Sequence, residues 1–318
     1  MENKKKILVL CGGKFALGAL QKLAFEQYLC GIGIGKGQDS VLESVSQASS
    51  ASGIPFKSFP TKQSASELRE WIEEINPDYI FSISFPFLID SETLEFGKNK
   101  FINFHPGPLP NFRGPMPIFE VLRYQEKQTA ISVHFMSEQF DEGELILSDP
   151  LAIEPNETFG TLATKMSKHV AQVALNLANM LQFASKVPSL PQTENEARYF
   201  EFPTLEDTLV NWKNMSASEI TSLINACNPW NNGADAYLND QLVQLVCASY
   251  RNAAHTHVPG TILGITDEGH IEIACFNNSI LLIEIIKSDL GILPAKKYAQ
   301  ITFPYIINPE RTPNEQLN

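Results

Sequence analysis

The sequence lacks several patterns that would place it directly in a class of protein. Its five cysteines are an odd number, and no two have C-x-x-C spacing, so neither a disulfide framework nor a zinc site is indicated. No apolar run approaches the roughly 20 residues that span a bilayer. The apolar stretch Ile7–Cys11 is shorter than a signal-peptide core and is typical of a buried strand. We therefore expect a cytoplasmic protein with reduced thiols and with neither a membrane nor a metal as partner.

Positive charge is also scarce. The formal net charge is −12, and the residues from 201 onward carry six Lys/Arg against thirteen Asp/Glu, which accounts for −7 of the total. A protein that grips a phosphate backbone usually presents a basic patch. The charge therefore disfavours a large nucleic-acid partner such as tRNA, although a local patch would still permit one.

A dinucleotide fingerprint is missing as well. Gly12, Gly13 and Gly18 follow the first predicted strand but do not have the spacing of G-x-G-x-x-G. These glycines are more typical of a tight turn. A dinucleotide-dependent oxidoreductase, which is the competing function for this type of sheet, is disfavoured for that reason.

What the sequence does contain is a regular alternation of short apolar runs and helical patterns in its first half. This alternation is typical of a doubly wound, mainly parallel sheet, which binds ligands at the carboxyl ends of its strands. The expected helices include one over Ser64–Ile75, with Ser64 as N-cap and Glu67 three residues later. The expected strands are Ile7–Cys11, Leu29–Ile34, Pro55–Phe59, Tyr79–Ile83, Phe101–His105, Ala130–Met136 and Glu144–Ser148.

The second half has a different pattern. A long amphipathic helix over Thr158–Phe183 closes a first domain, residues 1–185. Residues 186–211 contain several prolines and polar residues and are predicted to be a linker. One helix and several short strands then predict a smaller, β-rich domain over 212–318, with a barrel-like, OB-like architecture.

Candidate catalytic groups lie where two predicted strands end. Asn103 and His105 are two apart in one strand and so share a face, and a loop rich in proline and glycine follows them. Asp141 lies in a turn and precedes Gly143 by two residues. These groups suit acyl transfer to an amine: Asn103 and His105 can donate to a developing oxyanion, and a nearby Asp141 would favour the charged imidazole and help take the proton of the amine.

The same segments resemble the folate-dependent formyltransferases. The run from His105, H-P-G-P-L-P-N-F-R-G, is similar to that family's H-P-S-L-L-P-x-x-x-G signature, and Asp141-x-Gly143 resembles its D-x-G turn. The resemblance implies a Rossmann-like catalytic domain, an N-formyltransferase activity, and 10-formyltetrahydrofolate as co-substrate. It also implies that Asn103, His105 and Asp141 are the catalytic residues.

The resemblance further implies two sets of binding residues. Phe85 and Phe87 are either core residues or walls of the folate pocket, and Arg113 either contacts an anionic group of the acceptor or holds its own loop. The residues implied for the formyl donor are Phe85, Phe87, Leu88, Ile89, Phe140 and Gly143. Those implied for the acceptor are Pro106, Gly107, Pro108 and Arg113.

The acceptor itself is left open by the sequence. Asn228-Pro229-Trp230 and Pro259-Gly260 resemble landmarks of the C-terminal domain of methionyl-tRNA formyltransferases. The acidic charge instead favours a small-molecule amine, either an amino sugar nucleotide or an aminoacyl-type group. The alternatives are formylation of initiator methionyl-tRNA, hydrolysis of formyltetrahydrofolate, and a binding module without catalysis.

Overall fold

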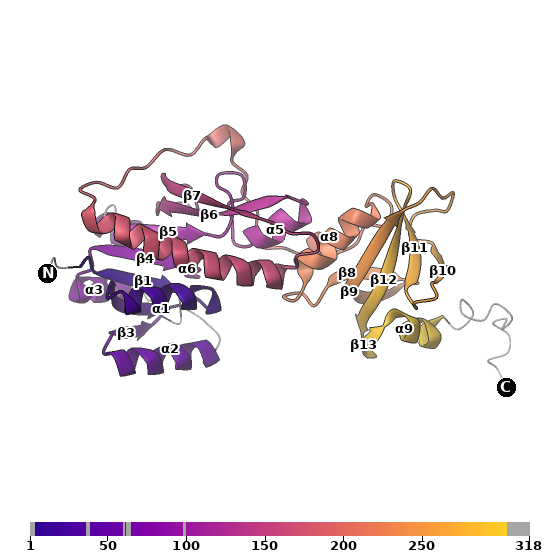
Figure 1. Cartoon of the computed structure of the whole chain (residues 1–318), viewed down its shortest axis with the longest axis horizontal. Helices are drawn as coiled ribbons and strands as arrows, with labels where there is room; N and C mark the ends of the chain where they lie inside the picture. The colour runs from indigo at the N-terminus through magenta and orange to yellow at the C-terminus, as the bar shows by residue number, and fades with distance from the viewer. Residues whose placement is uncertain (1–3, 36–38, 60, 62–64, 98–99, 304–318) are drawn as a thin grey trace. The chain divides into compact units, whose positions relative to one another are not determined.

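A computed structural model describes residues 4–35, 39–59, 61, 65–97 and 100–303 of the 318. Its contacts divide the chain into two compact units (Figure 1). The first contains residues 1–117, 128–152 and 163–201, and the second contains residues 118–127, 153–162 and 202–318. The predicted linker is therefore shared between the units: its part up to residue 201 packs within the first unit.

The first unit is built on a seven-stranded sheet with the order β3-β2-β1-β4-β5-β6-β7. The first five strands in this order are parallel, and β6 and β7 run antiparallel to their neighbours. The predicted doubly wound, mainly parallel sheet is thus confirmed. The strands are β1 (Ile7–Cys11), β2 (Leu29–Ile34), β3 (Phe56–Ser58), β4 (Tyr79–Ile83), β5 (Phe101–His105), β6 (Gln128–Phe135) and β7 (Leu145–Ala152).

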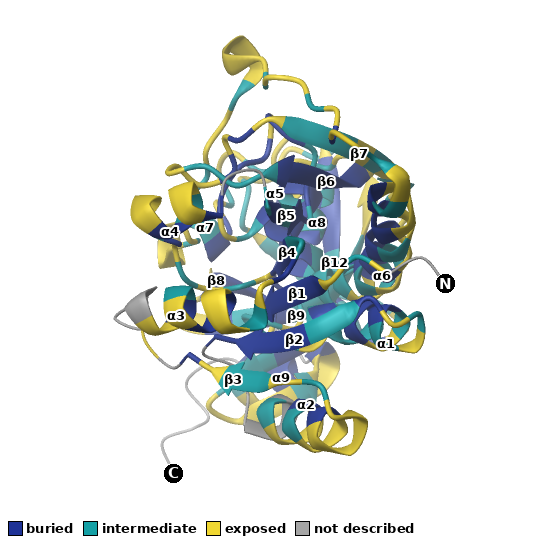
Figure 2. Ribbon diagram, turned by 90° about the vertical axis from the view of Figure 1, so that its left-hand side faces the viewer, coloured by how far each residue is buried: buried dark blue, intermediate teal, exposed yellow. Residues whose placement is uncertain are grey.

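Helices cover this sheet on both faces, as Figure 2 shows with α1 and α6 on one side and α3 and α4 on the other. Every residue of β1 is buried, which explains why its sequence is continuously apolar rather than alternating. On one face Leu8 and Leu10 pack with Trp71 of α3 and Phe59 in one core cluster. The helices of this unit are α1 (Leu17–Phe25), α2 (Asp39–Ser52), α3 (Ala65–Ile75), α4 (Ser91–Phe96) and most of α6 (Phe159–Phe183), whereas α5 (Pro117–Arg123) belongs to the second unit after its first residue.

Two of these helices have no counterpart in the predicted elements. α4 has only six residues, and its start is marked by Asp90, whose carboxylate accepts a hydrogen bond from the backbone N–H of Thr93. α5 begins at Pro117, the position where a proline costs a helix nothing. Both are too short for an apolar period to reveal them. The predicted cap Ser64 lies outside the described residues.

The second unit contains an antiparallel sheet with the order β10-β11-β12-β9-β8, and β13 pairs with β12. α8 is closed at its start by a capping box between Ser216 and Glu219, as the sequence predicts. The described strands and helices of this unit are α7 (Leu205–Thr208), α8 (Ala217–Cys227), β8 (Ala234–Leu238), β9 (Gln241–Asn252), β10 (Ile262–Ile265), β11 (Ile271–Cys275), β12 (Ser279–Ser288), β13 (Gly291–Pro294) and α9 (Ala295–Thr302).

Candidate active site

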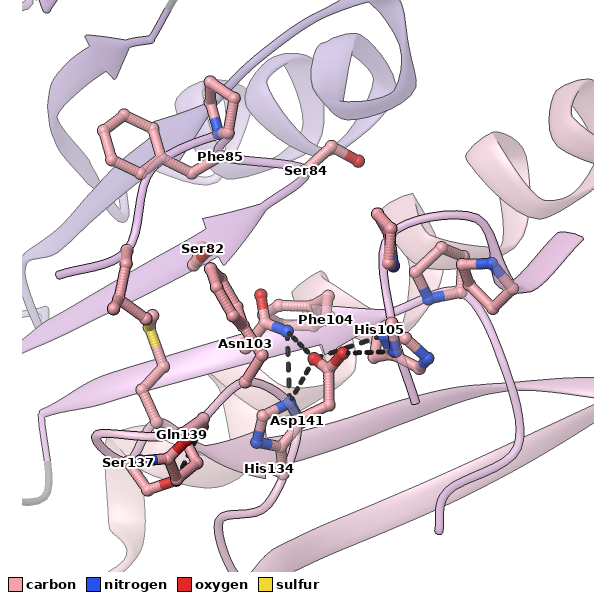
Figure 3. A pocket seen from close by; sticks show the side chains of 18 of the residues that line it. Ser82, Ser84, Phe85, Asn103, Phe104, His105, His134, Ser137, Gln139 and Asp141 are labelled. Carbon is pink, nitrogen blue, oxygen red and sulfur yellow. Dashed lines mark hydrogen bonds and ion pairs between the residues drawn. The ribbon is translucent and has the colours of Figure 1, made fainter. Parts of the chain in front are cut away.

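A cavity of about 520 Å³ opens beside the ends of β4 and β5 in the first unit. Asn103 and His105 reach it from β5, His134 from β6, and Asp141 from the turn that follows β6 (Figure 3). The opposite wall comes from the loop after β4, where Ser84 and Phe85 lie (Figure 3). The described polar groups therefore gather on one side of the cavity and face an apolar wall.

The register of β5 and β6 places four polar side chains together. In this antiparallel pair Asn103 lies opposite His134, and His105 lies opposite Ser132. Residues two apart in a strand share a face, so all four belong to one face of the sheet. Ser132 is buried, and its hydroxyl donates to the carbonyl of Gly107 at 2.7 Å and accepts from the N–H of Leu109 at 3.1 Å. That pair of bonds ties the loop after β5 to the sheet.

Asp141 is the centre of the polar cluster. Its Oδ1 lies 3.3 Å from Nδ1 of His105 and 3.6 Å from Nε2 of His134, and it accepts a 3.4 Å bond from Nδ2 of Asn103. Its Oδ2 accepts from the backbone N–H of Gly114 at 3.0 Å. Burial alone would raise the pKa of this carboxyl, but the adjacent imidazole of His105 holds it well below its usual range. Asp141 is therefore a fixed negative charge.

The close approach of two backbones explains the glycine in this turn. A Cβ at Gly143 would lie 1.7 Å from the carbonyl oxygen of Phe135, so only glycine fits there. The positive φ falls instead at Asp141, with a value of 59°. A residue other than glycine rarely adopts this conformation, which costs of order 1 kcal/mol or more.

His105 has both ring nitrogens engaged by acceptors. Nε2 donates to the carbonyl of Phe112 at 2.7 Å, and Nδ1 faces the Asp141 carboxylate. Burial disfavours the charged ring, but the carboxylate and the carbonyl outweigh this and raise the pKa of His105 above its ordinary value of 6.5. The ring is only 3% exposed. The arrangement therefore holds a buried imidazolium beside the cavity.

His134 was not among the residues that the sequence indicated. Its Nδ1 bonds to the carbonyl of Phe135 at 2.8 Å, so in the neutral ring this nitrogen carries the hydrogen and Nε2 is the acceptor. Nε2 lies 3.1 Å from Nδ2 of Asn103, which donates to it. Figure 3 shows the amide oxygen of Asn103 on the side away from His134 and Asp141. A histidine near the end of a predicted strand, two residues from Ser132 and so on the same face, is the sequence signal that could have indicated it.

The residues predicted to bind the formyl donor are only partly brought together. Phe85, Phe87, Leu88 and Phe140 line the cavity. Phe85 and Phe87 also pack against the core cluster of the sheet, so they belong both to the core and to the wall of the cavity. Ile89 is different, because it is 2% exposed within that core and does not line the cavity. Gly143 does not line the cavity either, and its role in the structure is to allow the close approach of the turn to the backbone of Phe135.

The residues predicted to bind the acceptor are mostly occupied elsewhere. Pro106 lines the cavity, but Gly107 and Pro108 form the loop, where their carbonyls accept from Ser132 and from the N–H of Phe112. Arg113 is 4% exposed, and its guanidinium bonds to Gln192 and Glu194. The structure therefore places Arg113 as an anchor of its loop and not at the cavity.

Tyr199 is a lining residue that the sequence did not indicate. It belongs to the predicted linker, where nothing in the local pattern distinguishes it from a solvent-exposed aromatic residue. Gly114, Pro115 and Pro117 line the cavity as well. Among the described lining residues Asp141 is the single carboxylate, and none is a lysine or an arginine.

Within the described ranges no three His, Cys, Asp or Glu side chains lie together as a metal-binding group. None of the helices that the structure describes is long and apolar enough to cross a membrane.

Comparisons with known proteins agree with this geometry. Residues 33–176 match the family model "Formyl transferase", and residues 204–301 match "Formyl transferase, C-terminal domain". The methionyl-tRNA formyltransferase of Syntrophus aciditrophicus is 28% identical over 289 residues, which is 89% of this chain and 91% of that protein. This chain belongs to the folate-dependent formyltransferase family. The corresponding protein of Clostridioides difficile is 27% identical to this formyltransferase over 288 residues, 88% of this chain and 91% of the relative.

Solved structures share the fold of this formyltransferase. A sugar 3N-formyl transferase, WlaRD, crystallised in the presence of dTDP and 5-N-formyl-THF, matches with a TM-score of 0.68 at 17% identity, over 88% of this chain and 97% of that one. HypX from Aquifex aeolicus in complex with tetrahydrofolic acid matches with a TM-score of 0.61 at 18% identity, over 96% of this chain. The formyltransferase spans about half of HypX, 48% of its length.

Proposed function

We propose that this enzyme transfers the formyl group of 10-formyltetrahydrofolate to the primary amine of a small-molecule acceptor. The observation that carries the proposal is the convergence of Asn103, His105 and Asp141 at one side of the cavity. Oδ1 of Asp141 lies 3.3 Å from Nδ1 of His105 and 3.4 Å from Nδ2 of Asn103. These residues come from two separate segments. Such a buried cluster of a cation, an anion and an oriented amide is costly for a fold that does not use it.

The opposite wall of the cavity suits the donor. Phe85, Phe87, Leu88 and Phe140 offer apolar surface against which a flat pterin ring would pack. A cavity of about 520 Å³ falls within the usual range for small-molecule sites. Membership of a folate-dependent family supports the same donor.

The polar side supplies the chemistry that acyl transfer to an amine requires. The amine is its own nucleophile, so the protein needs to orient it and to stabilise the oxyanion. The amide oxygen of Asn103, which His134 turns away from the cluster, would accept a hydrogen from the amine. The buried imidazolium of His105 would stabilise negative charge as it develops on the formyl oxygen.

The proton balance of the transfer assigns a different role to Asp141 from the one expected. The attacking nitrogen loses one proton and the leaving folate nitrogen gains one, so no net proton is consumed. With its pKa held so low, Asp141 is a poor base for the amine proton. We assign it the task of keeping His105 charged. The proton that the attacking nitrogen loses passes to the leaving nitrogen, directly or through a water, so that His105 keeps both of its ring protons.

A small-molecule acceptor is supported by the charge of the protein. The net charge of −12 disfavours a partner with a long phosphate backbone, such as a tRNA. Methionyl-tRNA is the second candidate, because the relatives that share 28% and 27% identity over 91% of their length are methionyl-tRNA formyltransferases.

The test follows tetrahydrofolate release and the mass of the product. The protein is incubated with 10-formyltetrahydrofolate and, in turn, an amino sugar nucleotide, an aminoacyl thioester and charged initiator tRNA. We expect a formylated small-molecule product; formate without such a product would identify a hydrolase instead. His105→Ala and Asn103→Ala should lower kcat by about 10²–10⁴. The matched control is His169→Ala, a histidine on α6 that pairs with Asp149 and does not line the cavity. Turnover unchanged in His105→Ala would contradict the assigned roles.

A further inference from the structure

The segment from Ser189 to Phe200, which the sequence predicts as linker, pairs with both loops that form the active site. Leu190 exchanges two backbone hydrogen bonds with Leu145, next to the turn of Asp141. Further along, the N–H of Arg113 donates to the carbonyl of Arg198 at 3.0 Å, and the N–H of Phe200 donates to the carbonyl of Arg113 at 3.0 Å. We call residues 189–200 the strap.

Side chains strengthen the second of these contacts. The rings of Phe112 and Phe200 stack with centroids 5.6 Å apart and an angle of 15°. The backbone approach is so close that a Cβ at Gly114, where φ is 117°, would lie 2.0 Å from the carbonyl oxygen of Phe200. The loop after β5 is therefore fixed against the strap as well as against the sheet.

Gln192 lies in the middle of the strap and joins the two loops through its side-chain amide. Its Nε2 donates to the carbonyls of Asp141 at 2.7 Å and Gly143 at 2.8 Å. Its Oε1 accepts from Nε and from the second guanidinium nitrogen of Arg113, at 3.2 and 3.0 Å. A guanidinium can only donate, so Oε1 must face Arg113 and Nε2 must face the two carbonyls. The amide therefore has one satisfactory orientation.

The atoms that Gln192 holds are those of a strained turn. Asp141 has its φ at 59°, a conformation that relaxes unless the surroundings hold it. The carboxylate of the same residue must stay beside His105, and its other neighbours, the side chains of Asn103 and His134 and the N–H of Gly114, contact only the side chain. The bond from Gln192 acts on the backbone.

We propose that Gln192 is a positioning residue of the formyl-transfer site, which holds the turn of Asp141 in place by bridging its backbone to Arg113. The effect of Gln192 on formyl transfer rests on the function proposed above, but its effect on the position of the Asp141 turn does not. Gln192 itself does not line the cavity, so its loss would remove no group that touches a substrate. Its effect passes through the position of the Asp141 carboxylate relative to His105.

The experiment compares the native protein with two variants. Gln192→Met has a similar length but no hydrogen-bond donor, and Gln192→Asn keeps the amide on a shorter stem. Glu196→Gln, an exposed residue of the same strap, is the control. The first measurement is the NMR titration of the His105 ring. The charged groups near this ring are the Asp141 carboxylate, which faces it directly, and His134, which contacts the same carboxylate. The second is kcat and KM for formyl transfer.

We expect the titration midpoint of His105 to fall by about half a pH unit or more in both Gln192 variants, because the carboxylate moves away. We expect kcat to fall about tenfold to a hundredfold with KM little changed, since misplacement of a catalytic group affects the reaction more than binding. The control should match the native protein in both respects. If the native protein shows no transfer with any acceptor, the proposed function fails, while the titration still decides the role of Gln192.

The proposal is overturned if folded Gln192→Met and Gln192→Asn keep the native midpoint of His105. It is equally overturned if they lose thermal stability but keep the native kcat, because a purely structural residue would give that result. Gln192→Asn serves as the measurement if Gln192→Met does not fold.

Discussion

Replacing Asp141 by asparagine should discharge His105. The carboxylate lies 3.3 Å from Nδ1 of the imidazole, so at an effective dielectric constant of about 20 their attraction is at most about 5 kcal/mol. Desolvation opposes this attraction, and the net effect is a pKa of His105 above its ordinary value. In the variant, the new amide N–H would face Nδ1 and favour the neutral ring, which keeps its Nε2–H on the carbonyl of Phe112.

The pair also makes stability depend on pH, and the sign follows from the two shifts. The raised pKa of His105 gives stability that is present below its ordinary value of 6.5 and is lost as the pH rises through the folded value. The depressed pKa of Asp141 gives stability that is present above its ordinary value of 3.8 and is lost as the pH falls through the folded value. The native protein should therefore exceed Asp141→Asn in unfolding free energy most between about pH 4 and pH 6.5, by about 1.5–3 kcal/mol, the usual contribution of a hydrogen bond to a charged group.

Two measurements check this prediction. Urea unfolding of both proteins at pH 5.5 and pH 9 gives the difference in free energy, and NMR titration gives the midpoint of His105. The ring signal is assigned from its absence in His105→Ala. A difference in unfolding free energy that is the same at both pH values would refute the reasoning, as would a midpoint for His105 that Asp141→Asn leaves unchanged.

Three further predictions concern other parts of the molecule. Burial raises the pKa of Glu120 to about 7, so the native protein loses stability as the pH rises and this carboxyl ionises. The unfolding free energy of Glu120→Gln, measured with urea, should therefore rise by about 2–3 kcal/mol relative to that of the native protein between pH 5 and pH 8. Gly143→Ala should destabilise the protein by more than about 2 kcal/mol, measured in the same way, because its Cβ would overlap the carbonyl of Phe135; an unchanged midpoint would show that the turn is free to move. Phe140→Ala should raise KM for the formyl donor about tenfold with kcat little changed, whereas Phe25→Ala, on an exposed surface, should change neither in steady-state assays.

Local sequence was sufficient for the sheet and for the side chains on its strands. The alternation of apolar runs and helices predicted a doubly wound sheet, because each such run must be buried between helices. Asn103 and His105 could be placed on one face from the period of a strand alone. Asp141 was predicted from its turn, although the backbone strain falls on Asp141 itself and the glycine is required for close approach.

Which residues meet across the fold was decided only by tertiary structure. His134 enters the site through the register of β5 and β6, which places it opposite Asn103. Ile89 was predicted for the donor pocket, but it lies in the core since its neighbours on the loop after β4 take the exposed positions.

Arg113 and Gln192 are a second case of a contact that the sequence could not predict, because they lie far apart along the chain. A guanidinium in a loop next to candidate catalytic residues is a reasonable ligand for an anion, and a glutamine among prolines is a reasonable linker residue. Their pairing requires the strap to fold back after α6 and lie against the loop of Arg113. The sequence by itself determined the sheet, the catalytic candidates and the family resemblance, because these depend on local periodicity and contiguous motifs. The charge state of His105, the orientation of Asn103 and the burial of Arg113 depend on partners far away along the chain, and only the folded arrangement supplies them.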